Sequence, residues 1–96
     1  MLESSVQKKI INYLKKEYKG AVIWKLAEHV LCGVPDIYFA YEGKSFFFEV
    51  KRPGGIRRPL QKVTIKKLNS NKIPSYFVES VDEVKEILSK FTSWQM

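Results

Sequence analysis

The sequence predicts an α/β sandwich with the element order α-β-β-β-α-β-α and a central mixed sheet. Three observations support this fold class. An amphipathic helix pattern opens the chain, two alternating strand patterns flank Glu42-Gly43, and a helix, a strand and a second helix follow. The hairpin supplies antiparallel pairing, and the helix that crosses over to the last strand supplies parallel pairing. The 96 residues fit one domain, residues 1–96, with a core of about 3–90.

The first helix is expected from Leu2 to Tyr18, because apolar residues recur there at spacings of three and four. Gly20 suits a left-handed residue after the helix end. The segment from Ala21 to Ala27 is rich in β-formers and predicts the first strand. Within it, Trp24 is expected in the core rather than as a base-stacking platform. The loop from Glu28 to Pro35 then carries His29 and Cys32, which we interpret as a loop residue and a small filler.

The segment from Ile37 to Phe48 predicts a β-hairpin with Glu42-Gly43 at its turn. This register places Asp36 directly opposite Glu49. Because side chains alternate along a strand, one face of the hairpin is core and the other is mixed. The core face holds Ile37, Phe39, Phe46, Phe48 and Val50, and the mixed face holds Asp36, Tyr38, Phe47, Glu49 and Lys51.

The second half of the chain begins with a loop from Arg52 to Arg58 and a helix from Pro59 to about Ser70, since proline suits a first helical turn. A short strand is expected from Ser75 to Glu79. Ser80 and Glu83 then form a capping box that opens the last helix. The expected buried residues are Leu60, Val63, Thr64 and Leu68 in the first of these helices, and Val84, Ile87, Leu88 and Phe91 in the second.

The amino-acid composition indicates which kinds of partner and compartment to expect. Seventeen Lys and Arg against ten Asp and Glu give a net charge of +7, which favours a polyanionic partner such as nucleic acid. A single cysteine excludes an internal disulfide framework and a cysteine-based zinc cluster, as expected in a reducing compartment. No apolar run approaches membrane-spanning length and no signal-peptide core is present, so we expect a cytoplasmic protein without a membrane partner.

Asp36, Glu49 and Lys51 form the candidate chemical site. Opposed carboxylates repel each other, so their pairing is costly unless a cation lies between them. Oxygen ligands of this kind suit Mg²⁺ or Mn²⁺, which recruit phosphate oxygens. We expect a charged Lys51 that orients the attacking water and stabilises negative charge on phosphorus. The alternative interpretation is a surface salt-bridge cluster.

At these residues the chain resembles the PD-(D/E)XK nucleases, through Gly33-Val34-Pro35-Asp36 and Glu49-Val50-Lys51. The finer resemblance is to the compact virus-type replication-repair nuclease domain, VRR-NUC, with Glu3 and Gln61 at the remaining motif positions. It runs from about Glu3 to Leu88.

This resemblance implies a restriction-endonuclease-like sandwich and DNA cleavage that depends on Mg²⁺ or Mn²⁺, with no organic cofactor. It implies metal ligation by Asp36, Glu49 and the Val50 carbonyl, with Glu3 reaching the metal directly or through water. It also implies that Gln61 supports the catalytic lysine or a phosphate. Stand-alone members resemble Holliday-junction resolvases, which implies a homodimer acting on branched DNA and a viral or bacterial origin.

Positive side chains near the site are candidate phosphate contacts. They are Lys25, Arg52, Arg57, Arg58 and Lys62. Two alternatives to a nuclease stay open from the sequence: a non-catalytic DNA-binding module, and a nicking subunit of a larger replication or repair assembly. In each case, a chain this short has no separate recognition domain, so we expect selectivity for substrate shape rather than base sequence.

Overall fold

The computed structural model describes residues 2–26 and 33–91. The element order is the predicted one. The helices are α1 (Glu3–Glu17), α2 (Pro59–Ser70) and α3 (Val81–Ser89), and the strands are β1 (Val22–Lys25), β2 (Ile37–Tyr41), β3 (Lys44–Val50) and β4 (Ser75–Val78). No helix within these residues is long and apolar enough to cross a membrane. His29, Cys32 and Trp94 lie outside the described residues.

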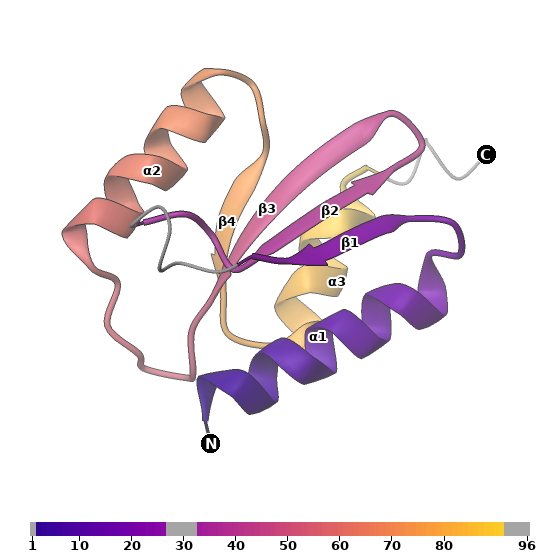
Figure 1. The fold of residues 1–96 in the computed structure, drawn as a ribbon, viewed down its shortest axis with the longest axis horizontal. Helices are drawn as coiled ribbons and strands as arrows, with labels where there is room; N and C mark the ends of the chain where they lie inside the picture. Colours follow the sequence, from indigo (N-terminus) through magenta and orange to yellow (C-terminus); the bar gives the residue numbers. More distant parts are fainter. Residues whose placement is uncertain (1, 27–32, 92–96) are drawn as a thin grey trace.

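The four strands form one mixed sheet in the order β1-β2-β3-β4. β1, β2 and β3 pair antiparallel, and β4 joins β3 in parallel after the α2 crossover (Figure 1). The β2-β3 register is the one predicted, with Ile37 paired to Phe48 and Tyr41 to Lys44. Its two-residue turn places Glu42 and Gly43 at positive φ values of 49° and 80°, as tight hairpins require.

The main core lies between one face of the sheet and the helices α1 and α3, which pack against each other (Figure 1). The predicted core face of the hairpin is confirmed, since all five of its side chains are buried. Two elements supply the facing layer. The buried residues of α1 are Val6, Ile10 and Leu14, and those of α3 are Val84 and Leu88.

Helix α2 lies on the opposite face of the sheet and contacts mainly β4 (Figure 1). Its predicted inner stripe is wrong in part, because Leu60 and Val63 are exposed while Thr64 and Leu68 are only half-buried. The buried residues are Gln61 and Ile65. The helix is rotated relative to the expectation because the polar Gln61 side chain is held inside the site described below.

Two further differences concern the ends of elements and one aromatic residue. β1 is shorter than predicted, ending at Lys25. Trp24 was expected in the core, but it is 58% exposed, because it lies on the sheet face opposite to α1 and α3. At the start of α3, the Ser80 hydroxyl accepts a hydrogen bond from the Glu83 N–H at 3.1 Å, which confirms one half of the predicted capping box. The Glu83 carboxylate accepts from the Glu79 N–H rather than from the Ser80 N–H.

Candidate active site

Asp36 is fixed at the entrance to β2 by both its backbone and its side chain. Its carbonyl accepts a hydrogen bond from the Leu26 N–H at 2.7 Å, which continues the β1-β2 ladder. Its Oδ2 accepts one from the Val50 N–H at 2.8 Å. This second bond crosses to β3 where the regular pairing ends. Asp36 is therefore held at the end of the hairpin with only 9% of its surface exposed.

Glu49 on β3 and Lys51, one residue past its end, lie on the same face of the sheet as Asp36, which directly precedes the neighbouring strand of the hairpin. Glu49 and Lys51 are 2% and 4% exposed, and the Lys51 Nζ lies 3.6 Å from the Glu49 Oε2. Two buried charges are costly unless they are paired, and this pair compensates part of that cost. The alternative of a surface salt-bridge cluster is therefore excluded, because all three charged groups are buried.

Gln61 connects helix α2 to this pair. It is 5% exposed, and its Nε2 donates a hydrogen bond to the Glu49 Oε2 at 3.0 Å. Its Oε1 accepts one from the Arg58 N–H at 3.2 Å, which caps the first turn of the helix. Gln61 thus holds the Glu49 carboxylate and positions the start of α2 over the site at the same time.

Gly33 allows α2 to approach the strand that carries Asp36. Its φ is +84°, which disfavours any residue with a side chain. A Cβ at this position would lie 2.8 Å from the Leu60 Cγ and 3.1 Å from the Thr64 Oγ1. The glycine of the Gly-Val-Pro-Asp segment is therefore required by both backbone conformation and packing.

A cavity of about 270 Å³ brings these groups together. Its lining contains all four predicted catalytic residues and the predicted Glu3. Ile56 also lines it and was not predicted, because nothing distinguishes a loop isoleucine in the sequence. The full lining consists of Glu3, Asp36, Glu49, Lys51, Arg52, Ile56, Arg58 and Gln61.

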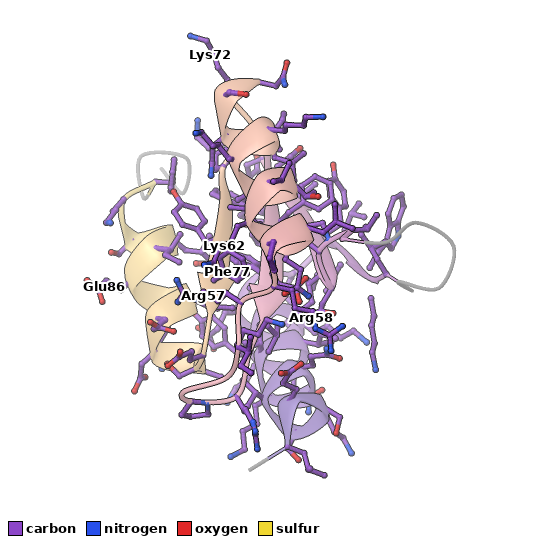
Figure 2. The ribbon with its side chains drawn as sticks, turned by 90° about the vertical axis from the view of Figure 1, so that its left-hand side faces the viewer. Arg57, Arg58, Lys62, Lys72, Phe77 and Glu86 are labelled. Carbon is purple, nitrogen blue, oxygen red and sulfur yellow. The ribbon has the colours of Figure 1, made fainter. Side chains whose placement is uncertain are left out.

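The five predicted DNA contacts lie in four different places. Arg52 and Arg58 line the cavity, whereas the Arg57 guanidinium lies 4.8 Å from the ring centroid of Phe77 on β4. Figure 2 shows Arg57 near Phe77 and Arg58 on the other side of the loop that leads into α2. Lys62 is exposed on α2.

Lys25 lies elsewhere. It pairs with Ile37, so its side chain projects from the core face of the sheet, at the α1 edge. It lines a separate cavity of about 420 Å³ together with Lys8, Asn12 and neighbouring residues of α1. The expectation that Lys25 lies beside the cleft is wrong, because its side chain is on the other face of the sheet, and its contact with DNA stays a prediction.

The donor set fits a hard divalent cation. Asp36 and Glu49 supply two carboxylates to one cavity, and oxygen donors of this kind suit Mg²⁺ or Mn²⁺. The Val50 N–H points at Asp36. Because a strand residue presents its N–H and C=O to the same edge, the Val50 carbonyl also faces the strand that carries Asp36 and is available as a third oxygen ligand. Within residues 2–26 and 33–91, no three His, Cys, Asp or Glu side chains gather closely enough to hold a metal ion. Glu3 therefore lines the cavity without joining the pair, and its role through water stays a prediction.

Comparison with known proteins identifies the fold. A solved structure described as a VRR_NUC domain superimposes with a TM-score of 0.77 at 22% sequence identity, covering 91% of this chain and 94% of that chain. No family model matches the sequence, and no curated protein matches it. The α-β-β-β-α-β-α order and the mixed sheet of this chain are those of the VRR-NUC fold.

Proposed function

We propose that this chain, which has the VRR-NUC fold, is a metal-dependent DNA endonuclease that hydrolyses phosphodiester bonds. One observation carries the proposal. Two buried carboxylates on paired strands, a buried lysine and a buried glutamine converge on one open cavity with two arginines. A purely structural role does not account for so much buried charge around a cavity, because burying charges in a small domain lowers its stability.

Asp36, Glu49 and the Val50 carbonyl would hold Mg²⁺ or Mn²⁺. When bound, such a cation polarises the phosphodiester, lowers the pKa of a coordinated water and stabilises the leaving oxygen. The Val50 N–H fixes the Asp36 carboxylate, and the Gln61 amide fixes the Glu49 carboxylate. Both ligands are therefore held in place before substrate arrives, which reduces the reorganisation that catalysis requires.

Lys51 is the proposed catalytic cation. Its ammonium lies beside Glu49 on the cavity wall, where it can donate hydrogen bonds to an attacking water and to a phosphate oxygen. Arg52 and Arg58 line the same cavity and can hold the phosphates that flank the cleaved bond. Gln61 acts as a positioning residue, since it touches Glu49 and the helix start.

We propose branched DNA as the substrate and a homodimer as the active form. The net charge of +7 supports a polyanionic partner such as DNA. Leu60 and Val63 expose apolar side chains on α2, which supports coverage by a second copy. Two symmetric sites would cut two strands of a junction. Sedimentation velocity tests the dimer, and a monomer at micromolar concentration would refute it.

The decisive experiment is cleavage of a four-way DNA junction in Mg²⁺ or Mn²⁺ by the wild type and Lys51→Met. The methionine keeps the buried stem but removes the ammonium. We expect a rate lower by about 100- to 1,000-fold, the usual effect of losing one such donor. Lys66→Met, an exposed change on α2, is the matched control and should cleave normally.

Two outcomes would contradict the proposal. A folded, metal-saturated wild type that cleaves no DNA of any shape would favour the non-catalytic binding module. Lys51→Met with wild-type cleavage would remove this cavity from the chemistry.

A further inference from the structure

We propose that Trp24 is a stacking platform for an unpaired nucleobase of the DNA substrate, next to the candidate active site. The inference deepens the proposed function and rests on it, because it names the part of the substrate that lies beside the carboxylates. It assigns a specificity-determining role to a residue outside the VRR-NUC motif positions.

The sheet register places Trp24 close to the site. Trp24 pairs with Tyr38, and Tyr38 pairs with Phe47. Paired residues share a face, so these three rings form a row across the face that also carries Asp36 and Glu49. Tyr38 follows Asp36 by two positions, and Phe47 precedes Glu49 by two. The row therefore lies two residues along the strands from the two carboxylates, which is a distance of about 7 Å on the same face.

The rings of this row support one another. The ring centroids of Trp24 and Tyr38 are 5.3 Å apart, and those of Tyr38 and Phe47 are 5.1 Å apart. The Tyr38 hydroxyl is fixed by a hydrogen bond of 3.1 Å with the Ser45 hydroxyl. The indole is thus backed by a second ring that is itself held in place, while 58% of Trp24 is open to solvent.

An exposed aromatic ring alone is ordinary on a protein surface. Here the ring packs against Tyr38 and lies on the sheet face that carries Asp36 and Glu49, whose cavity also contains two arginines, in a chain of charge +7. A nucleic-acid strand matches this combination, because it offers negative phosphates to the cavity and a π-face to the ring. We therefore assign this row to DNA, and a second copy of the chain at this row is an alternative outcome of the test below.

The platform also specifies which DNA is preferred. In a duplex both faces of each base are stacked on neighbours, so a protein ring stacks only on a base that has left the stack. An unpaired nucleotide at a branch point, a flap or a single strand satisfies this requirement. The structure therefore points to a strand with an unpaired base within about one nucleotide of the cleaved phosphate.

The test uses a full-length Trp94→Phe, Asp36→Asn protein, in which Trp24 is the only tryptophan and cleavage is blocked. The probes are a single-stranded thymidine dodecamer and a dodecamer of abasic deoxyribose phosphates with the same charge. We expect the thymidine probe to quench Trp24 fluorescence and the abasic probe to leave it nearly unchanged.

Substitutions at position 24 separate stacking from simple apolar contact. Fluorescence anisotropy of labelled thymidine dodecamer should show binding about 10- to 100-fold weaker for Trp24→Leu. Trp24→Phe, which keeps an aromatic face, should bind within about threefold of the parent. Val22→Ala, an exposed change nearby on the same face, should bind like the parent. All variants should bind the abasic probe equally.

Three results would overturn the inference. The abasic probe could quench as strongly as the thymidine probe, or Trp24→Leu could bind thymidine like the parent. Tryptophan emission that shifts with protein concentration in the absence of DNA, with a dimer lost in Trp24→Leu, would assign the row to a second copy. If the wild type cleaves DNA but Trp24 quenching does not depend on the base, only this inference is refuted. If the quenching depends on the base but the wild type cleaves no DNA, only the proposed nuclease activity is refuted.

Discussion

Asp36→Asn should stabilise the metal-free protein and abolish its stabilisation by metal. Two like charges about 5 Å apart, as expected for directly opposed strand residues, repel by about 3 kcal/mol at an effective dielectric constant of about 20. Lys51 beside Glu49 offsets part of this repulsion. The asparagine oxygen can still accept the Val50 N–H bond, so the net gain should be about 1–3 kcal/mol.

Bound metal opposes this difference in stability, because it stabilises the wild type more than the variant. At 100 times its dissociation constant, a bound cation adds about 2.7 kcal/mol to the free energy of unfolding of the wild type and little to that of the variant. Each kcal/mol shifts Tm by about 4–8 °C in a chain of this size. Thermal unfolding followed by circular dichroism in EDTA and in Mn²⁺ therefore measures both effects.

The matched control is Glu86→Gln, the same loss of charge on exposed α3, remote from the cavity (Figure 2). It should change neither the metal-free Tm nor the response to Mn²⁺. The reasoning is refuted if Asp36→Asn lowers the metal-free Tm and still gains stability from Mn²⁺ as the wild type does.

Three further predictions concern single side chains. Gln61→Met should lower the free energy of unfolding by about 1–3 kcal/mol, because the Glu49 carboxylate loses a buried hydrogen-bond donor. Urea denaturation measures this change, with the exposed substitution Lys66→Met as the control. An unchanged midpoint would remove Gln61 from the support of Glu49. Arg58→Ala should weaken DNA binding and reduce the slope of the logarithm of the DNA association constant against the logarithm of salt concentration by about one. Lys72→Ala, beyond the far end of α2, should change neither quantity (Figure 2). Equal slopes for both variants would contradict a phosphate contact by Arg58. Burial, followed by the neighbouring Tyr18, raises the pKa of Tyr13 to about 12, above its usual value of 10.0. The neutral ring therefore stabilises the fold fully below pH 10, and this contribution is lost as the pH rises through 12. Between pH 10 and 12, the free energy of unfolding of Tyr13→Phe should fall less steeply with pH than that of the wild type. Identical pH dependences of the two proteins would show that Tyr13 does not contribute.

Local patterns in the sequence were sufficient for the sheet and the acidic pair. The Glu42-Gly43 turn fixes the hairpin register, and the register alone places Asp36 against Glu49. The two carboxylates could be placed together because a strand pairing converts sequence separation directly into spatial contact.

The orientation of α2 and the exposure of Trp24 depend on tertiary contacts that periodicity does not contain. Periodicity favours Leu60 and Val63 as the buried face of the helix. The structure instead buries Gln61, because its amide finds the Glu49 carboxylate on another element. Among the described residues, α2 contacts mainly β4 rather than β1, and Trp24 on the same sheet face is 58% exposed. The DNA contacts of the arginine loop likewise depend on tertiary placement.

A titration with Mn²⁺, followed by electron paramagnetic resonance of the free ion, tests the central claim most directly. The wild type should bind at least one Mn²⁺ per chain, Glu49→Gln should lose this binding, and Glu86→Gln should retain it. A wild type that binds no Mn²⁺, or a Glu49→Gln variant that binds it with unchanged affinity, would contradict the assignment of Asp36 and Glu49 as a metal site.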